Sequence, residues 1–525
     1  MSKAPNFLFF MTDQHRADWL GCAGHPVLQT PHIDSLAATG TRFENFYVAS
    51  PVCMPNRASF MTGRFPSVHG LKTNGARLPL TANTFVDVLA AAGYHTASIG
   101  KSHLQSFTGI APFSSGEEKE GRLIEEAWRK DEGNYYQEEP NCYTTTDPYE
   151  FETPYYGFQH VDMVTKHGDK PGGHYQQWFQ KQMPNWKALQ NPKNELPHDY
   201  SCPQAYRTPI PDEHYNTAWV ADRAIDYLKD RRDDNNPFFA FVSFPDPHHP
   251  FNPPGKFWDM YKPEQFAVDL PFSAHKNPTP PMQWLEDNYR GEQKQLNPQT
   301  AMRLGDHDLK EIMALTAGMI SCVDSHIGRV IEALKTSGQY ENTVICFNAD
   351  HGDYLGDFNL MLKGLMPLKS INKVPFIWSD PADRAGKTTD TLASTIDIST
   401  TILERAGLIP YHGIQGKSFL PILQEDTQQH LEHRDEVFIE FNDGGAKFGF
   451  ERPCRVRSLI TKNWRLSMYR DQDWGELYDL QSDPDETNNL WTDATYINQK
   501  LQLTERLVHH LIYQMDESPR PERLA

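Results

Sequence analysis

The chain has 525 residues, which is long enough for one large domain and one smaller domain, each with its own core. Its 38% hydrophobic and 12% aromatic content is typical of a folded protein and excludes a largely disordered one. The formal charge of −19, from 50 basic and 69 acidic residues, argues against non-specific binding to nucleic acid or to an anionic membrane surface. Any anion-binding site must therefore be locally positive.

Four short apolar runs along the chain each end in polar residues. The first, NFLFFM, is followed at once by Asp13 and Gln14 with no cleavage site, so we predict a buried strand rather than a signal peptide. The other three runs are TASIG (96–100), PFFAFVSF (237–244) and TVICFN (343–348). Continuous apolar runs of this kind are typical of strands buried on both faces of a parallel sheet.

Helical patterns lie between these runs. Thr30 can cap a helix with Pro31 in its first position and Gly40 just past its end. Further helices are predicted over 83–92, 214–232 and 308–337. Strands that alternate with helices predict an α/β sheet covered on both faces, and in such sheets the functional site lies beyond the carboxyl ends of the strands.

Two stretches lack this periodicity. Residues 105–213 are rich in Gly, Pro, Tyr and charge, and residues 252–300 are rich in Pro, Gln and Asn. We predict that both are long excursions from a catalytic domain spanning 1–425, and that the first covers the mouth of the site. After about residue 425, antiparallel strands and a final amphipathic helix near 497–515 predict a small C-terminal α+β domain over 426–525.

The strongest local motif is the run Cys-Met-Pro-Asn-Arg at 53–57. Pro55 rules out a helix running through Cys53 but suits a helix that begins just after it. A helix N-terminus carries unpaired N–H groups and the positive end of the dipole, and Arg57 adds a fixed cation. Both would lower a thiol pKa and hold an anionic ester. The alternative is a small buried thiol beside an unrelated arginine, which explains such a motif less often.

A metal site is indicated by Asp350 and His351, which follow the run TVICFN. Adjacent Asp and His residues at a strand end can both reach one divalent ion. The alternative is a turn in which Asp350 caps the next helix, and for this motif alone the two explanations are equally frequent. Asp13 follows the first strand in the same way and, taken alone, is more often a cap or a turn residue.

Histidines and lysines follow the other predicted strands. His248, in the sequence Pro-His-His-Pro, could protonate a leaving group or bind its oxygen. Lys101 and His103 are two residues apart and would lie on the same side of an extended segment. Lys363 lies beyond Asp350. Each of them alone is more often a solvated residue, but a parallel sheet would bring the whole set together.

Taken together, these motifs resemble the sulfatase branch of the alkaline phosphatase superfamily, which includes arylsulfatases, choline sulfatase and phosphonate monoester hydrolases. The resemblance runs over most of the chain. In order, it is carried by the strand before Asp13, TPHIDSLAATGTRFENFYVASPVC, the Cys53 motif, GKSHL, FPDPHHPF, ADHGDYLGD with Lys363, and ELYDLQSDPDETNNL. It implies an alkaline-phosphatase-like α/β/α sandwich with a large, mixed, mostly parallel sheet, plus a small C-terminal antiparallel sheet with a helix.

The resemblance also implies a chemical modification of Cys53. In that family, a separate maturation enzyme oxidises the cysteine of this motif to formylglycine. One hydroxyl of the hydrated aldehyde attacks sulfur or phosphorus, activated by a divalent metal ion. The other hydroxyl then loses its proton, so that the aldehyde forms again and the anion is expelled.

Three groups of site residues follow from the resemblance. The metal ligands it implies are Asp13, Gln14, Cys53, Asp350 and His351. The catalytic residues, which form or steady the nucleophile, hold the non-bridging oxygens or protonate the leaving oxygen, are Cys53, Arg57, Lys101, His103, His248 and Lys363. The substrate-binding residues are Asn74, Lys101, His248 and Lys363, with Asn74 carried over from the phosphonate-hydrolase branch.

Two departures from the sulfatase pattern bear on the metal and the substrate. Many sulfatases have two consecutive carboxylates where this chain has Asp13 and Gln14, and Asn where it has His351. A less acidic shell with an imidazole favours Mn²⁺ over Ca²⁺, although Ca²⁺ is still compatible. Choline sulfatase and the phosphonate hydrolases share these substitutions. By contrast, Lys101 and His103 match the sulfatases.

We therefore predict an arylsulfatase-like hydrolase of sulfate monoesters that also acts on related esters. One alternative is a phosphonate monoester or phosphodiester hydrolase, and an alternative of another class is an inactive homologue that binds sulfated ligands. The predicted partners are a small-molecule ester, a maturation enzyme and further copies of the chain in a dimer or tetramer. Seven scattered cysteines with no CxxC pair do not suggest a disulfide framework, and we predict a cytoplasmic location.

Overall fold

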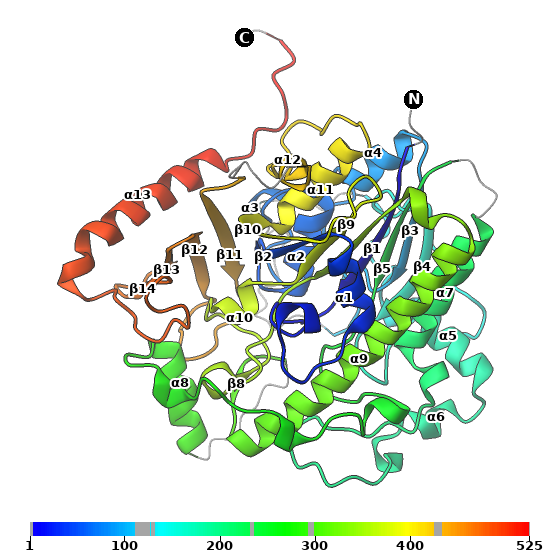
Figure 1. Cartoon of the computed structure of the whole chain (residues 1–525), viewed down its shortest axis with the longest axis horizontal. Helices are drawn as coiled ribbons and strands as arrows, with labels where there is room; N and C mark the ends of the chain where they lie inside the picture. The colour runs from blue at the N-terminus through cyan, green and yellow to red at the C-terminus, as the bar shows by residue number, and fades with distance from the viewer. Residues whose placement is uncertain are drawn as a thin grey trace, which may run out of the picture.

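A computed structural model describes residues 4–110, 127, 132–231, 236–291, 299–424 and 433–523. Its centre is an eight-stranded sheet in the order β10-β2-β9-β7-β1-β5-β3-β4 (Figure 1). Neighbouring strands are parallel, except that β9 runs antiparallel to both β2 and β7. The bounds are β1 (Asn6–Thr12), β2 (Thr41–Tyr47), β3 (His95–Gly100), β4 (His160–Thr165), β5 (Phe238–Ser243), β7 (Thr343–Ala349), β9 (Phe376–Ser379) and β10 (Lys387–Ser394). The predicted large, mixed, mostly parallel sheet is confirmed.

The four apolar runs form the four central neighbours β7, β1, β5 and β3. Every residue of β1, β5 and β7 is buried, as expected for strands covered on both faces. Their register aligns the carboxyl ends, because Gly100 and Met11 both pair with Ser243. Gly100 has φ 103°, and a Cβ there would lie 1.9 Å from the carbonyl oxygen of Ser243, so only glycine lets β3 end so close to β5. The residues after these strands therefore meet at one edge.

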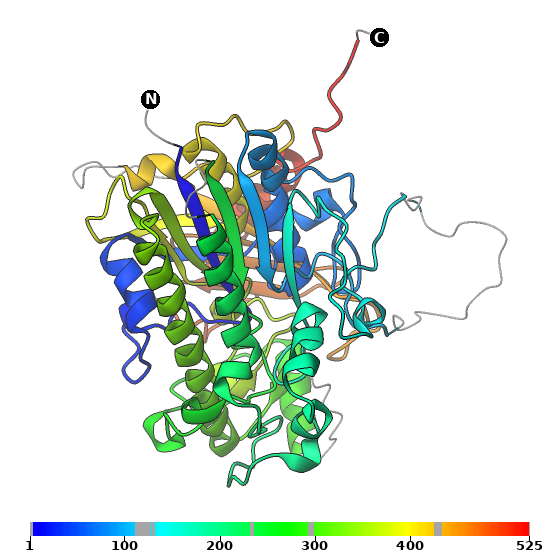
Figure 2. The same cartoon turned by 90° about the vertical axis from the view of Figure 1, so that its right-hand side faces the viewer.

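Helices cover both faces of the sheet. The side chains of β1 point alternately to one face and to the other, so each face has its own set of packed helices. Phe7, Phe9 and Met11 pack with α2 and α4, whereas Leu8 and Phe10 pack with α7 and α9. Figure 2 shows α7 and α9 facing the viewer. The helix bounds on the two faces are α2 (Cys53–Thr62), α4 (Phe85–Ala91) and α11 (Thr395–Arg405), and then α1 (Pro31–Ala38), α7 (Asn216–Asp230) and α9 (Asp306–Thr336).

The segment 105–213 contains a strand of the main sheet that the sequence pattern did not show. This strand, β4, pairs in parallel with β3 at the edge of the sheet, and α5 (Gly173–Gln182) packs against it. Its residues 111–126 and 128–131 lie outside the described part. The segment 252–300 contains α8 (Pro280–Arg290). In the described part of the chain, no helix is both long and apolar enough to cross a membrane.

The C-terminal part forms an antiparallel sheet in the order β11-β12-β13-β14, with a long helix beside it (left in Figure 1). Leu503 and Leu507 of the helix pack against Leu459 and Leu466 of the sheet. The predicted small antiparallel sheet with a helix is confirmed. The bounds are β11 (Glu436–Asn442), β12 (Arg455–Thr461), β13 (Trp464–Tyr469), β14 (Gly475–Asp479) and α13 (Ile497–Tyr513).

A buried ion-pair network connects this small sheet to the short helix α10 (Lys369–Asn372), which precedes β9 of the large sheet. The guanidinium of Arg465, 1% exposed, donates to Glu476 at 2.8 Å and to Glu486 at 2.5 Å. Glu486 also accepts from the backbone N–H of Lys369, at the start of α10, at 2.8 Å. Because a buried charge that loses its partner stays desolvated, the network should tolerate substitution poorly.

We expect Arg465→Met to lower the free energy of unfolding by about 3–5 kcal/mol, since it leaves two buried carboxylates without their cation. Urea titration followed by tryptophan fluorescence would measure the change. Lys462→Met is the control, because its pair with Asp390 is 65% and 57% exposed and should contribute about 0–1 kcal/mol. Equal losses in both variants would contradict a special role for the buried network.

Candidate active site

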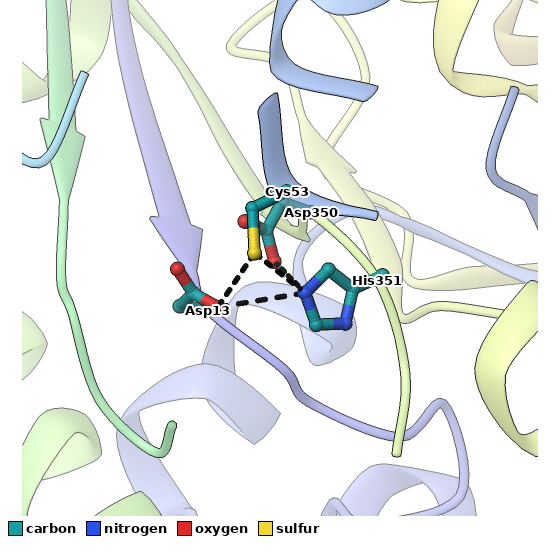
Figure 3. Close-up of side chains that lie close together, drawn as sticks. All are labelled: Asp13, Cys53, Asp350 and His351. Atoms are coloured by element: carbon teal, nitrogen blue, oxygen red, sulfur yellow. Dashed lines mark hydrogen bonds and ion pairs between the residues drawn. The ribbon is translucent and has the colours of Figure 1, made fainter. Parts of the chain in front are cut away.

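Four of the predicted metal ligands point toward one another at the carboxyl ends of the central strands (Figure 3). Asp13 follows β1, Asp350 and His351 follow β7, and Cys53 is the first residue of α2. One ligand atom from each of the four lies within 4.8 Å of the others, and all four residues are buried. The rule that parallel strands deliver their polar ends to one edge therefore accounts for this cluster.

Cys53 occupies the N-terminus of α2, directly after the extended residue Val52. Pro55 lies in the first turn, where its missing N–H removes no hydrogen bond. The sulfur of Cys53 lies 3.1 Å from Nε2 of His351 and 2.9 Å from Nζ of Lys363. The side chain is thus held between an imidazole and an ammonium group at the positive end of a helix.

The surroundings of Cys53 favour its negatively charged form. Burial and the carboxylate of Asp13 raise the pKa of the Cys53 thiol, but Lys363, His351 and Lys101 outweigh them and leave it below its ordinary value. Burial alone would also raise the pKa of Asp13, yet Lys101 and the other nearby cationic groups hold it well below its usual range. A protein with net charge −19 thus concentrates positive charge around this sulfur.

The guanidinium of Arg57 contacts residues at the ends of four strands of the large sheet. Its Nε donates to Asp350 at 2.7 Å, and a terminal nitrogen lies 3.4 Å from Asp13. The other terminal nitrogen donates to the hydroxyl of Ser243 at 2.9 Å and to the carbonyl oxygen of Lys101 at 2.7 Å. These contacts orient the two carboxylates, so Arg57 acts on Cys53 through its neighbours.

Gln14, the fifth predicted metal ligand, follows Asp13 and contacts two further carboxylates. Its Nε2 donates to Asp353 at 2.5 Å, and its backbone N–H donates to Asp350 at 3.1 Å. Its backbone has φ 60°, a left-handed conformation that is costly for a residue with a side chain. Its buried Oε1 has no hydrogen-bond partner among the described residues. A buried amide oxygen without a partner is a ligand atom that a divalent cation could use.

The residues present therefore fit a divalent metal ion. Asp13, Gln14, Asp350 and His351 would hold it, together with the side chain at position 53. When bound, such an ion would act as a Lewis acid for a charged ester and its attacking hydroxyl. Both oxygen and imidazole ligands are compatible with Mn²⁺, whereas Ca²⁺ prefers oxygen alone.

The segment from Lys101 to His103 is not extended, which corrects the expectation from their spacing. His103 has φ 60°, so the chain turns there, and its ring stacks on Phe107 with centroids 3.9 Å apart. Its backbone N–H donates to the carboxylate of Glu138 at 3.0 Å. Lys101 instead donates to Asp13. Burial, Lys101 and other nearby cations lower the pKa of His103 well below its ordinary value.

His248 and His249 both lie beside the cluster, but their contacts differ. Nδ1 of His248 lies 2.7 Å from the carbonyl oxygen of His249, so it is the protonated nitrogen. Nε2 of His248 then accepts from Nζ of Lys363 at 3.2 Å. Nδ1 of His249 lies 3.5 Å from the amide nitrogen of Gln14. Of these two histidines, His248 is the one that contacts Lys363, a cation that also reaches Cys53.

Asn74 lies at the exposed rim of the cluster. Its side-chain oxygen accepts from the backbone N–H of Met54 at 3.2 Å, which holds it next to Cys53 at the start of α2. A ligand that reaches Cys53 from solvent can therefore meet the amide of Asn74. Its predicted role in substrate binding stays a prediction.

Three residues of this site were missed by the sequence interpretation. Ser243 ends β5 and accepts from Arg57, and Asp353 accepts from Gln14. His167 follows β4 and lies 2.6 Å from Nζ of Lys101. The signal that pointed to Asp13 is weak for His167, because His160 and Asp162 interrupt the apolar residues of β4 that precede it.

Comparison with known proteins identifies the family. The sequence model of the family described as Sulfatase matches residues 5–408, and that of "N-sulphoglucosamine sulphohydrolase, C-terminal" matches residues 356–512. The first match covers more than half of the chain. The chain therefore belongs to the sulfatase family, whose members are sulfuric ester hydrolases, and the predicted membership is confirmed.

Similar proteins cover nearly the whole chain. The arylsulfatase of Clostridium perfringens is 28% identical over 498 residues, 94% of this chain and 91% of that protein. The multifunctional alkaline phosphatase superfamily protein PehA of Trinickia caryophylli is 27% identical over 94% of this chain and 92% of its own length. The crystal structure of the phosphonate monoester hydrolase of Agrobacterium radiobacter superimposes with a TM-score of 0.75 at 23% identity, over 98% of this chain and 97% of that one. That likeness confirms the alkaline-phosphatase-like fold.

We expect Asp350→Asn to lower the affinity for Mn²⁺ by about tenfold or more, because it removes a carboxylate ligand and weakens the contact that orients it, the one with Arg57. The metal content of the purified protein, equilibrated at buffered Mn²⁺ and measured by plasma emission, would show the change.

Asp246→Asn is the matched control for this experiment. Asp246 is fully buried after β5 and accepts from the hydroxyl of Thr217 at 2.6 Å, with no side-chain contact to the cluster. Burial raises its pKa to about 7, so a neutral amide should replace it with little disturbance. The proposed metal site would be wrong if both variants bound Mn²⁺ like the unchanged protein.

Proposed function

We propose that this protein hydrolyses sulfate monoesters through a formylglycine formed from Cys53. The observation that carries the proposal is the position of Cys53, which begins α2 beside Lys363 and His351 and within 4.8 Å of the carboxylates of Asp13 and Asp350. A nucleophile there faces cations that can hold an anionic ester. The similarity to arylsulfatases supports the same reaction.

The reaction has two steps that the side chains of the site can serve. One hydroxyl of the hydrated aldehyde passes its proton to the carboxylate of Asp13, which lies 3.9 Å from the sulfur of Cys53, and attacks the sulfur of the ester, so that a new S–O bond forms as the bond to the leaving oxygen breaks. Lys101 and Lys363, both buried, hold the non-bridging oxygens, and the pair of Lys363 and His248 supplies a proton to the leaving oxygen. The second hydroxyl then gives up its proton, the C–O bond to sulfate breaks, and the aldehyde forms again.

Two alternative functions are less well supported. A phosphonate monoester or phosphodiester hydrolase would use the same nucleophile and metal site, and the likeness to the phosphonate monoester hydrolase concerns the fold. The ammonium of Lys101, which contacts Asp13 inside the cluster, favours a sulfate ester as in the sulfatase pattern. An inactive homologue that only binds sulfated ligands would have no need for a buried thiol with a lowered pKa.

The remaining sequence predictions belong to this proposal. Maturation requires an enzyme that oxidises Cys53, and Mn²⁺ is favoured over Ca²⁺ because His351 offers an imidazole. The cytoplasmic location and the assembly into a dimer or tetramer stay predictions.

We expect the peptide that contains Cys53 to show conversion by mass spectrometry when the protein is made together with a maturation enzyme. The mass should fall by the exchange of one sulfur for one oxygen and the loss of two hydrogens. The peptide that contains Cys346, a cysteine buried inside β7, is the internal control and should keep its thiol mass. An unchanged Cys53 in protein made with that enzyme would contradict the proposal.

We expect matured protein to show a larger kcat/KM for an aryl sulfate than for the matched aryl phosphonate. Cys53→Ala should lower turnover by a factor on the order of 10⁴ or more, because the nucleophile is absent. Cys22→Ala, at a partly exposed cysteine outside the cluster, is the control and should retain activity. A larger kcat/KM for the phosphonate would favour the alternative function, and undiminished turnover by Cys53→Ala would refute the mechanism.

A further inference from the structure

His167 lies beside Lys101 and His248 but has no role in the proposed reaction. It follows β4, the edge strand, after Lys166, whose φ of 64° turns the chain toward the site. Its side chain is 14% exposed, so it is nearly buried but still reaches solvent. The ring has three contacts, with Lys101, His248 and Asp13.

The first contact joins His167 to Lys101. Nε2 of His167 lies 2.6 Å from Nζ of Lys101, and the same ammonium donates to Asp13. An ammonium group can only donate, so Nε2 of His167 is the acceptor and the ring proton sits on Nδ1. Burial and the charge of Lys101 lower the pKa of His167 to about 3, which agrees with a neutral ring.

The second contact joins His167 to His248. The two rings are stacked, with centroids 3.5 Å apart and an angle of 7° between their planes. His248 repeats the arrangement of His167, because its Nε2 accepts from Lys363 at 3.2 Å. Two neutral imidazoles in contact thus each accept a hydrogen bond from one lysine.

The third contact joins His167 to Asp13. Their side chains lie 3.7 Å apart, and with His248 they offer three ligand atoms within 4.8 Å of one another. The ammonium of Lys101 contacts both of them. A second metal ion there would meet a fixed positive charge, so the arrangement favours the lysine over another cation.

The stacked pair therefore fixes both lysines that flank Cys53. On one side, Lys101 is held between Asp13 and His167. On the other side, Lys363 is held by His248, His351 and the sulfur of Cys53. Because long lysine side chains have many rotamers, an acceptor that removes this freedom positions the charge before an ester arrives.

We propose that His167 is a positioning residue for the ester hydrolysis. It holds Lys101 by accepting its hydrogen bond, and it holds the ring of His248 by stacking. The inference rests on the proposed function, since it assigns Lys101 to the non-bridging oxygens and His248 to the leaving oxygen. A purely structural role would require only that the ring fill space.

Two substitutions separate the two contacts. His167→Phe keeps a flat ring against His248 but removes the acceptor for Lys101. His167→Gln keeps an acceptor oxygen for Lys101 but removes the stacked ring. His160→Phe is the control, because His160 begins the same strand with a side chain 42% exposed and pairs with Asp162 at 2.8 Å. The control should behave like the unchanged protein.

The readout is kcat/KM for a series of aryl sulfates with leaving groups of different pKa. We expect His167→Phe to lower kcat/KM by about tenfold to a hundredfold for every ester alike, since Lys101 meets the oxygens that all of them share. We expect His167→Gln to lower it more for poor leaving groups than for good ones, because proton donation through His248 matters most there. The slope against leaving-group pKa should therefore steepen only in the glutamine variant.

Several outcomes would overturn the inference. It would be wrong if both variants kept the kcat/KM and slope of the unchanged protein, or if both lost activity equally for all leaving groups in step with a lower melting temperature. It would also be wrong if either variant lost its bound metal, since His167 would then act on the metal site. Inactivity of fully converted, unchanged protein would instead refute the proposed function, so the two failures are distinguishable.

Discussion

The buried guanidinium of Arg57 is the contact on which the rest of the site depends. It donates to Asp350 after β7 and to Ser243 at the end of β5, and it also reaches Asp13 after β1 and the backbone of Lys101 after β3. One planar group thus joins the ends of the four central strands. A guanidinium offers five N–H donors in a fixed plane, which a lysine in its place could not match.

Such a group is costly to bury unless all its neighbours are in place. Arg57 and the carboxylates of Asp13 and Asp350 are fully enclosed, so each charge depends on the others for compensation. The arrangement can exist only when the four strands are in register and α2 is docked on the sheet. The site geometry therefore depends on the correct fold, and a shift in strand register would leave unpaired charges in the interior.

The same enclosure explains how an acidic protein can bind an anion. Lys101 and Lys363 are buried beside Cys53, where charges interact more strongly than in water, so the local potential there opposes the net charge of −19. The fold supplies neutral acceptors for both ammonium groups in His167 and His248. Neutral acceptors orient the lysines without cancelling their charge, which leaves it available to an ester.

Much of the fold and of the site could be predicted from the sequence, because the central strands are continuous apolar runs followed by polar residues. This pattern indicated β1, β3, β5 and β7 and brought Asp13, Lys101, His248 and Asp350 to one edge. Edge strands lack the pattern. His160 and Asp162 interrupt β4, because only one side of that strand is paired, and a strand at the edge can carry polar side chains. His167 was missed for this reason.

The sequence by itself determined the family, the class of fold, a helix that begins next to Cys53 and the residue types of the site, since local patterns record burial and helix ends. Only the tertiary structure decided which side chains touch. The left-handed backbone at Gln14 and His103 turns one toward Asp353 and the other toward Phe107. The stacking of His167 on His248 joins two loops that are remote in the chain. Such contacts depend on strand register and single backbone torsions, which no periodic pattern of residues encodes.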